Sequence, residues 1–186
     1  FFIPGTRVKQ RELRDKVPYS QWIERGFIQA SADNATDYRA VDEKIRWAMQ
    51  LFLVVSVHFD PANSRQISVL LIDAGYPCQE VLQGYQTLND PTNKLLELYL
   101  NGKLRHANNP VLYWNASCMA LRTDRQGRIM PWKPDRAKES KRIDGMAALV
   151  DALAGYVTQP PEKPDAGFAF IGAESKSERT ESASPA

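Results

Sequence analysis

The sequence predicts an α/β domain, because short apolar strands alternate with helices along its centre. The clearest strand is LVVSVHFD, residues 53–60, which is β-branched and apolar on both faces, as buried parallel strands are. The segment PANSRQISVLLIDAG, residues 61–75, follows as a helix with Pro at its first position and Gly at its end. A strand-like CQEVLQ at 78–83 and a helix-like DPTNKLLELYLNGK at 90–103 repeat this order.

The segments before this centre are mainly helical. Residues 6–25 predict two short helices that are separated at Pro18, and Gly26 has the position of a helix C-terminal cap. The segment FIQAS, residues 27–31, predicts a short strand. Residues 32–52 predict a further helix, because helix-start residues come first and apolar residues then recur at helical spacing.

The last part of the domain is predicted to be a hairpin followed by a helix. Two β-like runs, at about 117–123 and 128–133, flank DRQG, which is typical hairpin turn chemistry. A helix is predicted from Asp144 to Val157, with Met146, Val150 and Leu153 on its buried stripe. The domain is therefore expected to cover residues 1–157. Residues 158–186 are rich in Pro, Ser, Glu and Ala, and we expect a mostly disordered tail there.

The composition is that of one globular domain. Hydrophobic residues make up 43% and charged residues 25%, and no apolar run approaches the ~18 residues of a membrane span, so no membrane partner is expected. Cys78 and Cys118 fit no zinc spacing, and we expect two free thiols. The chain starts with Phe rather than Met, which suggests a fragment or a processed piece.

Basic side chains gather near the predicted hairpin, although the whole chain carries a formal net charge of only +2. Residues 122–142 contain eight basic side chains and three acidic ones. A local basic surface of this kind suits phosphate groups. We therefore expect Arg122, Arg125, Arg128 and Lys133 to contact phosphates.

Asp60 is the first candidate for chemistry. It stands at the carboxyl end of the predicted central strand, directly before a helix that begins at Pro61. Ligands of open α/β sheets usually bind at this edge. The same position also suits a helix N-cap, since Asp before Pro is a favoured arrangement, and position alone favours the cap.

Asp144, the second candidate, begins the last predicted helix, directly behind Lys141 and Arg142. It too suits an N-cap, where its carboxylate would accept hydrogen bonds from the first turn. Gly145 and Ala147 make that turn slim, so a ligand could approach it closely.

Asp60 and Asp144 together suggest a metal site, because two carboxylates from a strand end and a later helix can converge on one cation. Oxygen ligands without Cys or His suit Mg²⁺ or Mn²⁺ rather than zinc. Two such ions about 4 Å apart would activate water and stabilise the leaving oxygen of a phosphodiester. On the helix surface, Asp144 lies beside Ala148, Asp151 and Gly155.

The two histidines carry weaker signals. His58 lies inside the apolar strand, and a core or near-core role is the more ordinary interpretation. His106, in KLRHANNP, has basic and amide neighbours and suits a phosphate contact, while a plain loop junction fits equally well.

Several segments, in one order along residues 1–156, resemble the large terminase subunits of tailed bacteriophages. They are VPYSQWIERGFI, VHFDPANSRQ, QGYQTLNDPTNKLLELYLNGKLRHANNPVLYWNAS and RTDRQGRIMPWKPDRAKESKRIDGMAAL. The part that matches is the C-terminal nuclease half, which implies a ribonuclease H-like mixed sheet flanked by helices, with a basic β-hairpin. In that family the nuclease cuts concatemeric DNA with divalent metals held by a carboxylate cluster.

The resemblance places the family's metal carboxylates on Asp60 and Asp144, with Arg142 where Lys is more usual. Residues 83–87 match the family's Q-G-x-x-T loop. The loop of Arg105 and His106 matches L-R-H-G-G-N-P, although Ala and Asn, at 107 and 108, replace its two glycines and stiffen it.

Two family features are absent from this sequence. The first metal aspartate lies on an opening strand upstream of FFIPG in the family, so we expect the first strand or strands to be missing. No G-x-x-x-x-G-K-[ST] phosphate-binding loop occurs, so the motor half is absent as well. The chain then carries two of three expected ligands for Mg²⁺ or Mn²⁺.

The resemblance implies a metal-dependent endonuclease that acts on double-stranded DNA. Arg105, His106, Lys141 and Arg142 join the four hairpin cations as expected DNA contacts, although the hairpin could equally face the motor half or the portal. A non-catalytic DNA-binding or assembly module is the alternative. The implied partners are the small terminase subunit, the portal and further copies of the chain, in the cytoplasm of the infected or lysogenic bacterial host.

Overall fold

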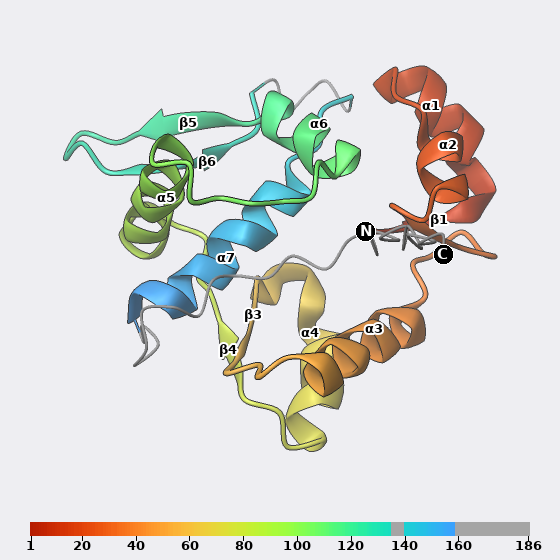
Figure 1. Cartoon of the computed structure of the whole chain (residues 1–186), viewed down its shortest axis with the longest axis horizontal. Coiled ribbons are helices and arrows are strands. Elements are labelled where there is room, and N and C mark those ends of the chain that lie inside the picture. Colours follow the sequence, from red (N-terminus) through yellow and green to blue (C-terminus); the bar gives the residue numbers. More distant parts are fainter. Residues whose placement is uncertain (135–139, 159–186) are drawn as a thin grey trace, which may run out of the picture.

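The computed structural model describes residues 1–134 and 140–158 and has helix α7 at its centre (Figure 1). The helices are η1 (Gly5–Arg7), α1 (Val8–Asp15), α2 (Tyr19–Glu24), α3 (Tyr38–Leu51), α4 (Pro61–Asp73), α5 (Tyr85–Leu100), α6 (Pro110–Cys118) and α7 (Asp144–Thr158). The strands are β1 (Phe2–Pro4), β2 (Gln29–Ser31), β3 (Val57–Phe59), β4 (Cys78–Glu80), β5 (Ala120–Thr123) and β6 (Ile129–Trp132).

The strands pair in both directions. β1 pairs with β2 and β3 with β4 in parallel, whereas β5 and β6 form an antiparallel hairpin. In the part of the chain that the structure describes, these pairs are three separate two-stranded sheets. Helices connect the β3–β4 and β5–β6 sheets, since α7 packs against β3 and α5 packs against both α7 and β6. The predicted mixed α/β fold is therefore confirmed.

The main core forms around α7, because one stripe of that helix is apolar. Met146, Val150 and Leu153 are buried in a cluster with Leu88 and Leu95 of α5, which confirms the predicted stripe. Figure 1 shows α7 between α5, α6 and the hairpin on one side and β3, β4 and α4 on the other. The helix therefore links the hairpin to the β3–β4 sheet.

A second core joins the N-terminal helices to α6. Tyr19 and Trp22 of α2 are buried with Ile28 and Val111, and Trp114 packs against this cluster. The rings of Tyr19 and Trp22 meet edge to face, with centroids 5.7 Å apart. Aromatic pairs in this geometry stabilise a core beyond the area that they bury.

The N-terminus of α7 is capped from another helix. The Asn115 Oδ1 atom, on α6, accepts a hydrogen bond of 2.8 Å from the backbone N–H of Gly145, and Asn115 Nδ2 donates to the Val111 carbonyl. Asn115 is 2% exposed, so this contact is shielded from water. An amide of α6 therefore satisfies a free N–H group at the start of α7.

The central strand is shorter than the sequence predicts. We expected a buried strand over residues 53–60, but β3 covers Val57–Phe59, and Leu53 and Val55 are exposed. The ladder begins where the Val57 N–H donates to the Pro77 carbonyl, and β4 is its partner on one side. Residues before Val57 have no strand opposite them in the described structure, so their apolar side chains face outward.

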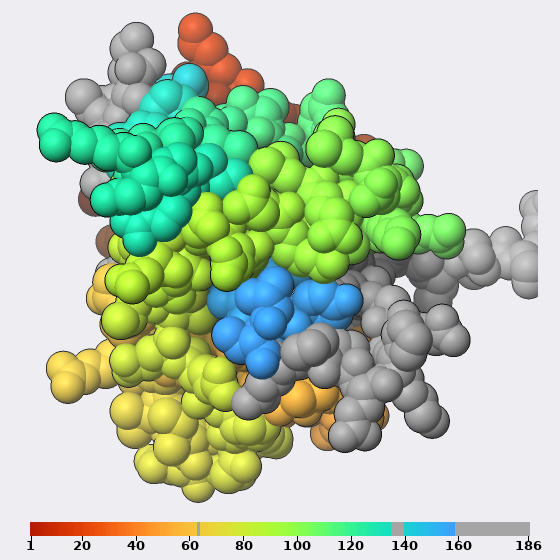
Figure 2. All heavy atoms as spheres, turned by 90° about the vertical axis from the view of Figure 1, so that its left-hand side faces the viewer, coloured from red at the N-terminus to blue at the C-terminus, as the bar shows by residue number. Residues whose placement is uncertain are grey.

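The other elements follow the predictions closely, with two differences. The two N-terminal helices, α3, α4, the hairpin and α7 are confirmed. Helix α5 begins at Tyr85 rather than near residue 90, with Pro91 inside it, and helix α6 was not predicted. The hairpin lies beside α5 (Figure 2), and the backbone N–H of Ile129 donates to Asn89 Oδ1 at 2.9 Å.

Some sequence predictions concern other properties of the chain. Cys78 and Cys118 are free thiols, as expected. No described helix has both the length and the apolar character that a membrane crossing requires. The predicted tail falls almost entirely on residues 159–186, outside the described residues.

Candidate metal and nucleic-acid site

A cleft of about 230 Å³ lies where β3, the loop after β4, the end of the hairpin and α7 meet. Its polar lining comes from Asp60, Gln83, Lys133 and Asp151. The apolar lining residues are Leu88, Met130, Pro131, Trp132, Ile143, Ala147 and Val150. Two carboxylates, an amide and an ammonium group therefore face one hollow.

Asp60 enters this cleft from the N-terminus of α4. Its Oδ1 atom accepts a hydrogen bond of 2.9 Å from the Ala62 N–H, so the predicted N-cap is confirmed. The Ser64 hydroxyl donates to the Asp60 carbonyl, which holds the same turn. Among the described residues, no donor is bonded to Asp60 Oδ2. The cap occupies one carboxylate oxygen and leaves the other for a ligand.

Asp151 faces Asp60 from the middle of α7. It is 6% exposed, and its Oδ1 atom accepts a hydrogen bond of 3.0 Å from Gln83 Nε2. Burial raises the pKa of Asp151, the Gln83 hydrogen bond opposes this rise, and the negative charge of Asp60 adds to it. The two carboxylates are thus close enough to repel each other electrostatically.

Asp144 does not line this cleft. It is exposed at the first position of α7, seven residues before Asp151, which corresponds to about 10 Å along a helix axis. Asn115, rather than Asp144, bonds the Gly145 N–H. The structure therefore places Asp60 with Asp151, and the pairing of Asp60 with Asp144 stays a prediction.

The four cations predicted on the hairpin differ in their surroundings. Lys133 lines the cleft, whereas Arg125 is exposed at the turn. Arg128 forms an ion pair of 2.7 Å with Asp124, and the Arg122 guanidinium lies over the Trp132 ring at 4.6 Å from its centroid. Lys133 and Arg125 are therefore more available to a phosphate than the other two.

The remaining predicted DNA contacts lie on two other segments. Arg142 approaches the buried Asp15 carboxylate, with 3.9 Å between Nε and Oδ2, and Lys141 beside it is half-buried. Arg105 is exposed, while His106 Nδ1 is buried without a hydrogen-bond partner among the described residues. The structure does not bring Arg105 and His106 to the cleft lining.

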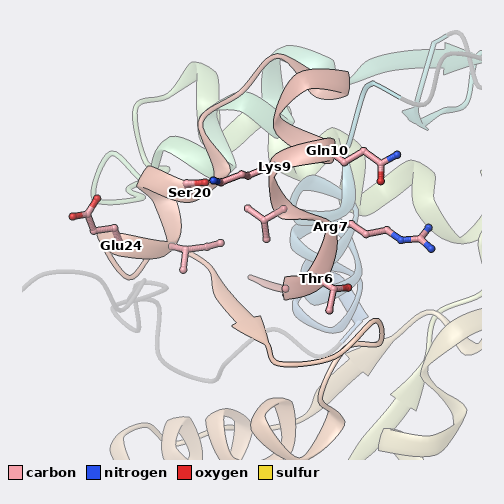
Figure 3. A pocket seen from close by; sticks show the side chains of 9 residues that line it. Thr6, Arg7, Lys9, Gln10, Ser20 and Glu24 are labelled. Atoms are coloured by element: carbon pink, nitrogen blue, oxygen red, sulfur yellow. The ribbon is translucent and has the colours of Figure 1, made fainter.

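A larger and more open hollow lies between α1 and α2 (Figure 3), with a volume of about 560 Å³. Its polar lining includes Arg7, Gln10, Ser20 and Glu24. In Figure 3 the Arg7 and Gln10 side chains extend to one side and Glu24 extends to the opposite side. Arg7 and Gln10 thus point away from Glu24, and the carboxylate of this hollow has neither of them beside it.

The comparisons with known proteins decide the family. The model of the family "Terminase large subunit, endonuclease domain" matches residues 1–159. The chain belongs to this family of terminase endonuclease domains. The predicted resemblance is confirmed.

This terminase domain is also similar to a characterised phage protein. It is 30% identical over 164 residues to the large terminase subunit of Enterobacteria phage HK97, a match that covers 86% of this chain and 32% of the relative. The crystal structure of the HK97 large terminase matches with a TM-score of 0.73 at 27% identity, over 83% of this chain and 32% of that chain. The domain therefore spans about a third of the relative's length.

The donor set of the cleft fits a hard divalent cation, which this family typically uses. Asp60, Asp151 and the Gln83 carbonyl oxygen are all oxygen donors, the type that Mg²⁺ and Mn²⁺ prefer. The described residues contain no group of three or more Asp, Glu, His or Cys side chains that could hold a metal. The terminase cleft thus offers two carboxylates and an amide.

Asp151 and Gln83 are the cleft residues of this terminase domain that sequence reasoning did not select. Asp151 follows Asp144 by two helical turns on one face, and Gln83 opens the Q-G-x-x-T loop, so both positions were visible in the sequence. What the sequence could not show is which turn of α7 lies opposite Asp60, since that depends on how β3 packs against the helix.

Proposed function

We propose that this chain is a metal-dependent endonuclease domain that cuts concatemeric double-stranded DNA during phage genome packaging. The observation that supports this most is the cleft, in which Asp60, Asp151 and Lys133 lie together in a chain of the terminase endonuclease family. Asp60 contributes the carboxylate oxygen that its N-cap leaves free. Asp144 is proposed as a further ligand from one end of the same helix face.

Each side chain of the cleft has a chemical task in this proposal. Asp60 and Asp151 would hold a divalent cation, which would supply Lewis-acid activation of water and stabilisation of the leaving oxygen of the phosphodiester. Lys133 neutralises the phosphate that enters the cleft, and the exposed Arg125 contacts the backbone of the flanking duplex. The other six predicted contacts (Arg105, His106, Arg122, Arg128, Lys141 and Arg142) extend this surface.

The setting of the reaction is proposed from the family. The large subunit acts with the small terminase subunit and the portal, as one of several copies around the DNA, in the cytoplasm of the infected or lysogenic host. The whole HK97 relative is about three times as long as this domain, so these partners belong to the proposal.

Plasmid nicking tests the catalytic proposal. The 186-residue chain should convert supercoiled DNA to the open circle in Mn²⁺, and Asp60→Asn should slow this at least ~100-fold. Asn keeps the N-cap of α4, so the variant removes charge without removing the cap. Asp144→Asn should also slow the reaction, whereas Asp73→Asn, at the exposed opposite end of α4, should not. Nicking that persists in Asp60→Asn would contradict the site.

The alternative is a non-catalytic DNA-binding or assembly module, which the absence of a three-carboxylate cluster among the described residues favours. Gel retardation separates the two functions. Plasmid that is retarded by the chain but never nicked in Mn²⁺ would support the alternative. Arg125→Ala should weaken retardation more than Arg128→Ala, because Arg128 is already paired with Asp124.

A further inference from the structure

Strand β3 and helix α7 pack in one fixed register. The His58 side chain lies against Gly155, where an added Cβ would come within 2.2 Å of His58 Nε2. Asp60 is two residues beyond His58 and therefore points to the same side of the strand. Asp151 is four residues before Gly155 and therefore lies one turn away on the same face of the helix. The contact of His58 with Gly155 thus brings Asp60 opposite Asp151.

The same register places Asp144 further along the helix. Asp144 lies two helical turns before Asp151, the residue that faces Asp60, which is about 10 Å along the helix axis. Oxygen ligands bind a hard divalent cation at about 2.0–2.6 Å, so two carboxylate oxygens that share one ion must lie within about 5 Å of each other. Asp151 is therefore nearer than Asp144 to an ion held by Asp60, which leaves Asp144 for a second ion of the site.

The hydrogen bonds of Asp151 indicate that one of its oxygens lacks a partner. The residue is 6% exposed, and among the described residues Gln83 Nε2 is its hydrogen-bond donor, at Oδ1. Gln83 Nε2 also donates to the Val81 carbonyl at 3.1 Å, which fixes the amide. Among the described residues the fully buried side-chain atoms without a hydrogen-bond partner are Asp42 Oδ1 and His106 Nδ1, so Asp151 Oδ2 keeps some surface that a ligand can reach. This oxygen belongs to a side chain that lines the cleft.

We propose that Asp151 is a carboxylate ligand that shares a divalent cation with Asp60, and that Gln83 is the positioning residue that orients it. The oxygen donors of this pair select a hard cation of the Mg²⁺ or Mn²⁺ class. The role of this cation in DNA cleavage rests on the proposed function, but its binding does not. Ion binding can therefore be measured without any nuclease assay.

Mn²⁺ binding to the 186-residue chain tests the proposal, measured from the electron paramagnetic resonance signal of the free ion. Asp151→Asn should lower Mn²⁺ affinity at least ~10-fold, and Gln83→Leu by about 3- to 10-fold with an altered spectrum of the bound ion. The matched control Asp73→Asn removes the same charge at an exposed site and should bind as the unchanged chain does. An affinity of Asp151→Asn equal to that of the control would overturn the proposal.

A second measurement needs no variant, so it remains decisive even where Asp151→Asn fails to fold. Substoichiometric Mn²⁺ should broaden the amide resonances of Ala62 and Asp151 in the unchanged chain before that of Gly145. Broadening centred on Gly145, or no broadening at all, would overturn the proposal. Binding that depends on Asp151 without any plasmid nicking would support this site and contradict only the proposed endonuclease function.

Discussion

The His58 imidazole lies directly against the backbone of Gly155, and its Nε2 atom is also 2.7 Å from the Ser56 hydroxyl. Strand β3 can approach α7 this closely because residue 155 has no side chain. The contact fixes which turn of the helix faces the end of the strand. Asp60 and Asp151 therefore owe their proximity to a glycine and a histidine that lie outside the cleft.

Gly155→Ala should lower the free energy of unfolding by about 1–3 kcal/mol, because the new Cβ overlaps the His58 ring. This loss should appear even though Ala favours a helix over Gly by about 1 kcal/mol. Urea unfolding followed by circular dichroism measures it. Gly84→Ala is the control, since nothing lies within 4 Å of its Cβ position. Equal stabilities of the two variants would contradict the close packing.

His58 should make stability depend on pH, because burial lowers its pKa below the ordinary 6.5. The unfolded chain then binds a proton more readily than the folded one. The contribution of His58 to the free energy of unfolding should be fully present above about pH 6.5. It should be lost as the pH falls through the lowered pKa of the folded state. In His58→Gln the urea midpoint of unfolding should change less with pH between about pH 7 and pH 5 than it does in the unchanged chain. If the urea midpoint of the variant changes with pH as steeply as that of the unchanged chain, the pH dependence comes from other groups.

Asn115→Ala should destabilise the domain by about 1–3 kcal/mol, because it leaves the Gly145 N–H without its acceptor in a buried place. Asn93→Ala is the matched control, since Asn93 is exposed and bonds only with Asn89 in the described structure. Thermal unfolding of both variants checks the difference. A loss no larger than that of the control would show that water replaces the Asn115 cap.

Ala107→Gly should stabilise the domain by ~0.5–1 kcal/mol. Ala107 and Asn108 adopt left-handed φ values of 46° and 52°, in the loop where the family pattern has two glycines. Such a backbone strains Ala, whereas Gly adopts it freely and loses only some unfolded-state entropy. Ala116→Gly, on the exposed face of α6, should instead cost about 1 kcal/mol. Urea midpoints should shift in opposite directions, and a shift of both in one direction would contradict the strain.

Local chemistry made much of this fold predictable from the sequence. Asp60 before Pro61 specifies an N-cap wherever the helix lies, and the structure has that cap. The residues of DRQG specify a tight turn, and Gly127 there has a φ of 79°. Each of these features depends only on residues within a few positions along the chain.

The features that were missed depend on residues far apart in the sequence. Helix α6 has apolar and aromatic residues on several sides, because it packs against both the N-terminal helices and α7, and this hides its helical period. The strand before Val57 was predicted to be buried, but a strand needs a partner that sequence patterns do not supply. Asp151 was not selected as a cleft residue for the same reason, since its position opposite Asp60 depends on how β3 packs against α7.

The hydrogen bond from Gly145 to Asn115 spans 30 residues and connects two helices that would otherwise fold separately. Since a short helix is unstable until its ends are satisfied and its apolar face is covered, the first turn of α7 can persist only once α6 is in place. Amide exchange at Gly145 should therefore report the opening of α6 rather than local fraying. We therefore expect α7 and α6 to unfold as one cooperative unit, so that the order of Asp151 in the cleft depends on that unit.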